Sequence, residues 1–234
     1  MNAARAQEIR DNLERVRERI AKAEMSAGRS PGSVTLIAVS KKMPADDIRA
    51  AIALGQRDFG ENYAQELRDK RVELDGEDIR WHYIGPLQSN KVRYVAGHTA
   101  LLHTIDSVEL LEETNRRTLD GQTQDCLLQV NVGGEVQKRG IAPSRLGQLL
   151  DAFATADRLR CVGLMTIPPI GDDAERVRPI FAELRALLER EAKVSREHVA
   201  LSALSMGMSQ DLEVAIAEGA TLVRIGTALF GERR

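Results

Sequence analysis

Apolar residues recur at helical spacing near the start of the chain. Ile9, Leu13, Val16 and Ile20 are separated by four, three and four positions, and arginine, glutamate and aspartate fill many of the positions between them. This spacing places the four side chains on one face, which predicts an amphipathic helix within residues 1–28. The stripe covers too few heptads for a coiled coil. We therefore expect the helix to cover the core of a domain.

From Gly32 onward, short apolar runs alternate with longer amphipathic stretches. Glycine, proline, serine or aspartate marks the changes between them. This alternation is typical of repeated strand–helix units. The apolar runs predict strands at 34–41, 58–62, 79–85, 100–106, 126–132, 159–167, 200–206 and 222–225.

The stretches between these runs predict helices that begin near Ala45, Tyr63, Ser89, Ser107, Ser144, Asp173 and Ser209. Strands that are apolar on both faces need helices outside them and a packed interior. We predict an α/β fold of one domain, a (β/α)8 TIM barrel over residues 33–231 with an extra N-terminal helix. A doubly wound open sheet is the alternative, but residues 40–44, the first strand–helix turn, lack the glycine fingerprint of a dinucleotide site.

Composition narrows the class of protein. The 234 residues are 43% hydrophobic and 29% charged, as in ordinary globular proteins. A net charge of -2 argues against a nucleic-acid or membrane-surface binder, which needs a basic face. Cys126 and Cys161 lie within apolar runs, which predicts reduced core thiols. The first residues form no apolar run suited to a signal peptide or membrane span, so we expect a cytoplasmic protein.

Lys41 stands at the end of the first apolar run, just before Pro44 restarts the chain as a helix. In a (β/α)8 barrel, the carboxyl ends of the strands form the catalytic face. A lysine with a partly desolvated amine can form a Schiff base there with a carbonyl compound or with pyridoxal phosphate. The alternative is a lysine that extends its amine from a strand end into solvent.

Small polar residues follow the last two predicted strands. Barrels often bind phosphate in the loops after strands seven and eight, where glycine allows a close approach to backbone N–H groups. Ser209 and the Gly226-Thr227 pair fit such a site. The alternative is that Ser209 caps the following helix and Gly226 serves a turn.

Six motifs, in order along the chain, carry a resemblance to a known family. They are Ala38-Val-Ser-Lys41, Phe59-Gly-Glu-Asn-Tyr63, Trp81-His-Tyr-Ile-Gly-Pro-Leu-Gln-Ser-Asn-Lys91, Gly163-Leu-Met-Thr166, Leu204-Ser-Met-Gly-Met-Ser209 with Asp211, and Val223-Arg-Ile-Gly-Thr227 through Phe230-Gly231. Over residues 36–231 the sequence resembles the pyridoxal phosphate homeostasis protein family. The resemblance implies one domain over 1–234, similar to the barrel of alanine racemase, that binds pyridoxal 5'-phosphate as a Schiff base without an established enzymatic activity.

The resemblance also implies which residues bind the cofactor. Lys41 would carry the Schiff base, and Arg224 would face the pyridine nitrogen. The phosphate would be held by three residues that follow the last two strands, Ser209, Gly226 and Thr227. The residues that would line the ring pocket or lie near the cofactor are Asn62, His82, Met165 and Ser205. The resemblance implies no catalytic residue and no metal ligand.

Simpler roles remain open for some of these residues. His82 fits a core histidine, Met165 fits barrel filling and Asn62 fits a helix cap. The sequence also departs from the common family pattern. Lys42-Met43 stands where Thr-Lys is frequent, which leaves two adjacent candidate lysines, and Gly133-Gly134 stands where a serine is frequent. Neighbouring strand residues point to opposite faces, so the inward position favours Lys41.

The residue that faces the pyridine nitrogen bears on whether the protein is an enzyme. An arginine such as Arg224 would keep that nitrogen unprotonated and weaken the ring as an electron sink. This favours a monomeric carrier that buffers pyridoxal phosphate and delivers it to apo-enzymes, without nucleic-acid or membrane partners. A low-activity amino-acid racemase is the alternative. A Schiff-base aldolase is a third candidate, which the long family motifs disfavour.

Overall fold

The computed structural model describes residues 3–135, 138–169 and 173–231. These residues form eight strands: β1 (Thr35–Val39), β2 (Asp58–Glu61), β3 (Arg80–Tyr83), β4 (Leu101–Ile105), β5 (Gln124–Gln129), β6 (Leu159–Met165), β7 (Val199–Ser205) and β8 (Leu222–Ile225). The α-helices are α1 (Ala3–Ser26), α2 (Ala45–Ala53), α3 (Ala64–Glu73), α4 (Val108–Arg117), α5 (Leu146–Asp151), α6 (Arg178–Glu191), α7 (Leu212–Ala217) and α8 (Thr227–Phe230). The 3-10 helices are η1 (Ser89–Tyr94), η2 (Pro143–Arg145), η3 (Ala152–Thr155) and η4 (Ala174–Val177).

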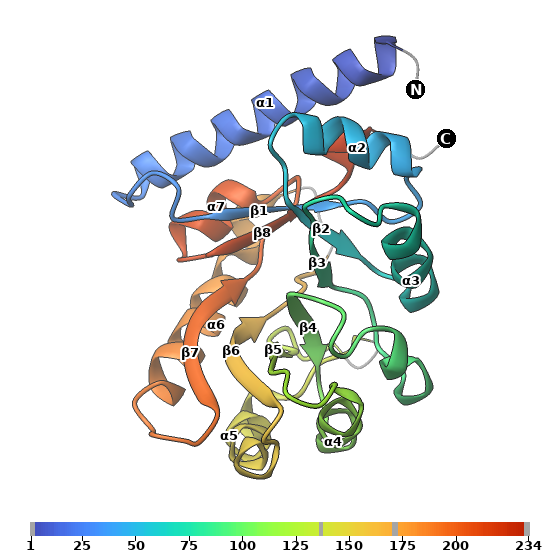
Figure 1. The fold of residues 1–234 in the computed structure, drawn as a ribbon. Helices are drawn as coiled ribbons and strands as arrows, with labels where there is room; N and C mark the ends of the chain where they lie inside the picture. Colours follow the sequence, from blue (N-terminus) through green and yellow to red (C-terminus); the bar gives the residue numbers. More distant parts are fainter. Residues whose placement is uncertain (1–2, 136–137, 170–172, 232–234) are drawn as a thin grey trace.

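The strands close into a barrel in chain order, and β8 pairs with β1 (Figure 1). All neighbouring pairs are parallel, as the predicted (β/α)8 fold requires. The register places Ile37 opposite Arg224 and Gly60 opposite His82. The carboxyl ends of the strands therefore meet at one mouth of the barrel, where the predicted site residues lie.

Side chains alternate between the two faces of the strands. Five of the inward-facing apolar residues form a small interior cluster: Ile37, Leu101, Leu127, Met165 and Leu222. The neighbouring positions, such as Leu36 and Ala38, belong to the larger core between the strands and the helices. Met165 is fully buried in the interior cluster, so its contacts match those of a barrel-filling side chain.

Helix α1 covers one side of the barrel and lies across α2 and α7 (Figure 1). Its four stripe residues, Ile9, Leu13, Val16 and Ile20, are all buried, which confirms the predicted amphipathic helix. Hydrogen bonds join α1 to α2, near the start of the barrel sequence, and to α8, near its end. Arg5 pairs with Asp47 of α2 and donates to the carbonyl of Phe230, and Asn12 donates to the carbonyl of Leu229.

Several element boundaries differ from the sequence-based expectation. The prediction that a helix begins at Ser209 is wrong, because α7 begins at Leu212 with Asp211 at its N-cap position. The segment after Ser89 is a short 3-10 helix, and β5 begins at Gln124, two residues before the predicted strand. Ser107 does cap α4 by accepting a hydrogen bond from the Leu110 amide.

Cys126 and Cys161 lie opposite each other on β5 and β6 as buried free thiols, as their apolar surroundings predicted. Burial raises the pKa of Cys161 to about 12, so its thiol is protonated at neutral pH. Within the part of the chain that the structure describes, every helix is too short or too polar to cross a bilayer.

Candidate functional site

Lys41 lies two residues after the end of β1, at the carboxyl-terminal mouth of the barrel. Ile37 lies in the interior cluster, and continuing its alternation along the chain gives Lys41 the inward parity. The next residue breaks the extended backbone, because Lys42 has a φ of 62° and an exposed side chain. Lys41 is half-buried. The two lysines therefore differ in exposure, and the inward direction of the Lys41 side chain stays a prediction.

The turn that carries Lys41 is held from outside the barrel by a buried ion cluster. The Lys70 ammonium of α3 donates to the Ser40 carbonyl at 2.7 Å, to Glu61 Oε1 at 2.8 Å and to Glu66 Oε1 at 2.7 Å. The Ser40 hydroxyl donates to Glu61 Oε1 at 2.7 Å, and the Lys42 amide donates to the Glu66 carboxylate. Residues on both sides of Lys41 are thus fixed, which limits the positions that its amine can reach.

Glu61 is fully buried within this cluster. Burial raises the pKa of its carboxyl group, while the charge of Lys70 and the hydrogen bonds from Lys70 and Ser40 oppose that change. Glu61 lies within one of the six sequence motifs, whereas Lys70 lies outside all of them. One feature of the sequence could have indicated this cluster. Glu66 and Lys70 stand four residues apart on a predicted helix, and this helix follows a strand that ends in Glu61.

Arg224 lies on the inner face of β8 and is 4% exposed. Its Nη1 donates to Ser205 Oγ at 2.6 Å, and its Nη2 donates to the Thr166 carbonyl at 2.9 Å. Burial lowers the pKa of the guanidinium to about 10, and the charge of Asp211 opposes the shift. The group is therefore a cation at neutral pH. The structure brings Arg224 and Ser205 together, as their positions at the ends of neighbouring strands imply.

Asn62 follows β2 at the same mouth. The alternative role of Asn62 as a helix cap is wrong, because the N-cap of α3 is Tyr63 and that cap has no side-chain hydrogen bond. Among the described residues, the buried oxygen Asn62 Oδ1 has no hydrogen-bond partner. The backbone beside it is tightly packed, since a Cβ on Gly85 would lie 2.0 Å from the Asn62 carbonyl oxygen. A buried acceptor without a protein partner suits a polar ligand at this mouth.

Ser209, Gly226 and Thr227 lie where the loops after β7 and β8 meet. Ser209 Oγ accepts a hydrogen bond from the Ala228 amide at 3.4 Å, and Arg19 of α1 donates to the Ser209 carbonyl at 3.0 Å. Gly226 approaches the end of β1, since a Cβ there would lie 3.4 Å from Val39 Cβ. Thr227 is exposed. Of the three residues that were predicted to bind phosphate, Ser209 thus lies in the loop after β7, Gly226 is the N-cap of α8 and Thr227 is its first residue.

Comparisons with known proteins identify the family. The model of the alanine racemase N-terminal domain matches residues 5–234. A pyridoxal phosphate homeostasis protein of Aquifex aeolicus is 45% identical over 226 residues, covering 96% of this chain and 98% of its own. The chain belongs to the pyridoxal phosphate homeostasis protein family.

Two further relatives agree with this assignment to the pyridoxal phosphate homeostasis proteins. The pyridoxal phosphate homeostasis protein of Escherichia coli K12 is 44% identical over 230 residues, covering 97% of both chains. The structure of PipY from Synechococcus elongatus with PLP bound is 39% identical, with a TM-score of 0.78, and the match covers 91% of this chain and 100% of PipY. The chain therefore spans nearly the full length of these family members.

His82 lies deeper in the barrel than the other predicted residues of this family site. Its Nδ1 is 3.0 Å from His103 Nε2, and its Nε2 is 3.0 Å from Asp58 Oδ1. Both ring nitrogens are therefore engaged, which matches the alternative of a core histidine. His103 and Asp58, the two hydrogen-bond partners of His82, could not be predicted from the sequence. They meet His82 through the register of neighbouring strands.

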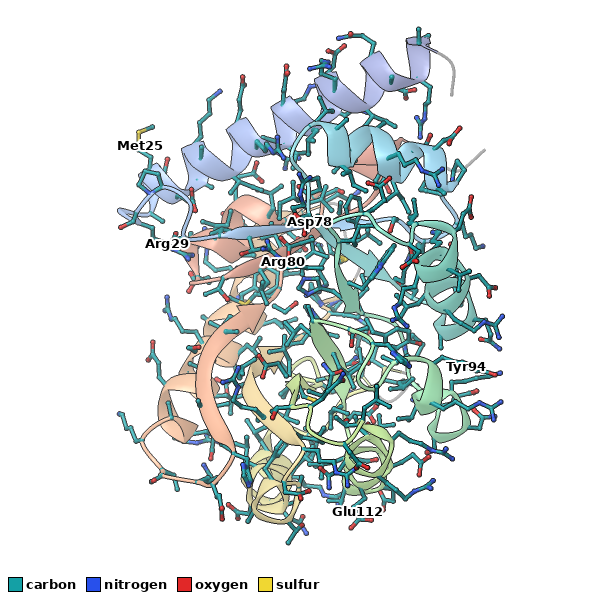
Figure 2. The ribbon with its side chains drawn as sticks, in the orientation of Figure 1. Met25, Arg29, Asp78, Arg80, Tyr94 and Glu112 are labelled. Atoms are coloured by element: carbon teal, nitrogen blue, oxygen red, sulfur yellow. The ribbon has the colours of Figure 1, made fainter. Side chains whose placement is uncertain are left out.

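The opposite, amino-terminal mouth of the barrel holds a hollow of about 460 Å³. Asp58, Arg80, His82 and Asp125 are among the residues that line it. Figure 2 labels Arg80 near the first residues of the strands, and its guanidinium pairs with Asp58. His82 therefore connects the interior of the barrel with this second mouth.

Proposed function

We propose that the protein binds pyridoxal 5'-phosphate at the carboxyl-terminal mouth of the barrel, as a Schiff base on Lys41. It holds the cofactor in reserve in the cytoplasm and delivers it to apo forms of pyridoxal-phosphate-dependent enzymes. The observation that carries the proposal is the structure of PipY with PLP bound, which is 39% identical to this chain. The lysine at the end of β1 supplies the amine that such a site requires.

The residues at this mouth suit the cofactor. The half-buried amine of Lys41 would hold the aldehyde carbon, and the cation of Arg224 would face the pyridine nitrogen. Ser209, Gly226 and Thr227 would bind the phosphate through hydroxyl and backbone N–H groups. Asn62 would accept a hydrogen bond from the cofactor through Oδ1, which has no partner among the described residues. Met165, in the interior cluster of the barrel, would form the floor of the pocket.

Arg224 favours storage over catalysis. Bound pyridoxal phosphate supplies an electrophilic carbonyl and, when its ring nitrogen is protonated, an electron sink. The pKa of Arg224 is about 10, so the group stays a cation at neutral pH and opposes a proton on a nearby nitrogen. The cofactor is thus held with its electron sink weakened. This is the chemistry expected of a carrier.

The tyrosines argue against the racemase alternative, which needs a base on each face of the substrate. Burial raises the pKa of Tyr83 to about 12, and its hydroxyl donates to the backbone carbonyls of Asn62 and Pro86. Tyr63 is 50% exposed, and Tyr94 lies on the outer side of η1 among arginine and lysine side chains. The Tyr83 hydroxyl therefore keeps its proton at neutral pH and is not suited to act as a general base.

The test of the proposal is reduction of the loaded protein with borohydride, followed by peptide mapping. We expect the visible absorbance band to disappear and the cofactor mass to appear on the peptide with Lys41. Lys41→Ala should lose the band while keeping the fold, because it removes an amine and little core volume. Lys42→Ala is the matched control and should keep the band. A band that survives in Lys41→Ala and is lost in Lys42→Ala would show that the wrong lysine is assigned.

Loaded protein incubated with single L-amino acids in deuterated water separates the carrier from the racemase. We expect Cα–H exchange no faster than with free cofactor. Faster exchange accompanied by loss of chirality would contradict the carrier function and support the racemase.

A further inference from the structure

A continuous chain of hydrogen bonds runs through the barrel interior from one mouth toward the other. Arg224 Nη1 lies 2.6 Å from Ser205 Oγ, which lies 2.9 Å from His103 Nδ1. His103 Nε2 lies 3.0 Å from His82 Nδ1, and His82 Nε2 lies 3.0 Å from Asp58 Oδ1. All five residues are at most 7% exposed. The chain begins at the proposed cofactor site and ends at the hollow of the amino-terminal mouth.

The two ends of this chain have fixed roles. A guanidinium has only donors, so Ser205 Oγ must accept from Arg224. Asp58 receives two hydrogen bonds from Arg80 and one from His82, and these outweigh the effect of burial and lower its pKa to about 2. Asp58 is therefore a carboxylate that can only accept. His82 must donate to it from Nε2.

The roles at the ends determine the roles in the middle. A neutral imidazole has one donor and one acceptor nitrogen. For a neutral His82, with Nε2 as the donor to Asp58, Nδ1 accepts from His103 Nε2. His103 Nδ1 must then accept, and the only proton available to it is that of the Ser205 hydroxyl. Burial and the charge of Arg224 hold the pKa of His103 well below its ordinary value, so this ring is neutral.

We propose that Ser205, His103 and His82 are positioning residues that aim Arg224 at the cofactor, with Asp58 as their anchor at the far mouth. Each residue of this series donates a hydrogen bond to the next, from the cation of Arg224 to the carboxylate of Asp58. The single hydroxyl proton of Ser205 is used by His103, so Ser205 serves the cofactor through Arg224 and does not donate to it directly. This inference rests on the proposed function.

Histidine tautomers test the chain without any cofactor. The sequence has four histidines, so nitrogen-15 spectra of labelled protein contain few imidazole signals. We expect His82 and His103 to be neutral with the proton on Nε2 at neutral pH. His98 and His198 take no part in this series of hydrogen bonds and serve as references. Their signals are assigned with the variants His98→Gln and His198→Gln. A proton on Nδ1 of either interior histidine would overturn the inference.

Ser205→Ala tests the link to Arg224 with a minimal change of volume. It removes the donor to His103 Nδ1, so we expect that nitrogen signal to move toward the value of an unbonded acceptor. We also expect binding of pyridoxal phosphate to weaken about tenfold and its absorbance band to shift, because Arg224 loses a hydrogen bond to a neighbour that fixes it. Ser202→Ala, an exposed residue on the same strand, is the matched control and should change neither.

The outcomes separate this inference from the proposed function. Wild-type protein that fails to bind pyridoxal phosphate would overturn the proposed function before any variant is compared. Wild-type protein that binds, with Ser205→Ala matching its affinity and spectrum, would overturn only the positioning role. His103→Phe repeats the comparison at the next residue, and its far-ultraviolet circular dichroism shows whether it folds.

Discussion

Single residues in this barrel carry charges that the core would otherwise exclude. Asp58 is 7% exposed at the start of β2 and remains ionised because Arg80 and His82 donate to it. Arg224 is a buried cation at the other end of the same interior. Each charge is tolerated because hydrogen bonds replace the water it lost.

Asp58→Asn should destabilise the protein at neutral pH. The pKa of Asp58 falls from 3.8 to about 2 on folding, and this shift corresponds to about 2 kcal/mol of stability. Because the folded pKa is the lower one, the stabilisation is present above the unfolded pKa of 3.8 and is lost as the pH falls through about 2. Urea unfolding of wild type and variant should therefore show a difference that shrinks in acid.

Asp78→Asn is the matched control for this measurement. Asp78 pairs with Arg57 but is 84% exposed, and Figure 2 labels it close to Arg80. Its loss should change the free energy of unfolding by less than about 0.5 kcal/mol at any pH. A pH-independent effect of Asp58→Asn would mean that its carboxylate contributes through shape and not through charge.

At the level of elements, the buried cluster around Lys70 joins three of them. The ammonium comes from α3, Glu61 ends β2, and the Ser40 carbonyl follows β1. A buried ion pair is costly to break because the remaining charge has no water. The cluster therefore fixes the turn that carries Lys41 relative to two strands and a helix.

Lys70→Met should lower the free energy of unfolding by about 3 kcal/mol, because it leaves the buried Glu61 without its cation. The double variant Lys70→Met with Glu61→Gln should lose less than the two single changes added together. Lys22→Met is the control, since Lys22 is 74% exposed and 4.0 Å from Glu18. Chemical denaturation of the four proteins measures the coupling, and strictly additive losses would contradict a shared cluster.

The elements themselves were predictable because parallel strands are buried on both faces and leave uninterrupted apolar runs. All eight predicted runs overlap a strand of the barrel, and six of them contain the whole strand. Boundaries were harder, because pairing decides where a strand ends. At Ser209 the local signal for a helix start was misleading, since Asp211 Oδ1 accepts from the Met208 amide and the loop continues to Leu212.

The site was predictable only in part, for a related reason. Lys41 could be placed from the end of an apolar run and its parity. The contact of His103 with Ser205 joins residues 102 positions apart, and the contact of Lys70 with Ser40 joins residues 30 apart. Such contacts follow from strand register and helix packing, which one sequence does not display.

For the whole molecule, α1 completes the outer layer of the barrel. Glu24, near its end, accepts from the Ser33 hydroxyl and the amides of Gly32 and Val34, which joins the helix to the entry of β1. Arg19 pairs with Glu213 of α7. The helix is thus part of the core and also holds the loops around the proposed phosphate site.

Leu13→Ala should cost about 2 to 5 kcal/mol, because Leu13 is fully buried under the barrel's outer layer and its loss leaves a cavity. Met25→Ala lies on the same helix and is the control, since Met25 is 73% exposed at the far end of α1 (Figure 2). Its effect should stay within about 0.5 kcal/mol. Equal and small effects in thermal unfolding would mean that α1 packs loosely on the barrel.

The packing of α1 also fixes the order in which the chain can mature during synthesis. The ribosome releases α1 before any strand, whereas α7 and α8, which it packs against, emerge only after the first seven strands. The bond from Arg5 to the Phe230 carbonyl joins residues 225 positions apart, and β1 likewise waits for β8. Until then α1 can pack against α2 but not against α7 or α8. Closure of the barrel and docking of its first helix are therefore one late event, and the unfinished nascent chain is the form most exposed to aggregation.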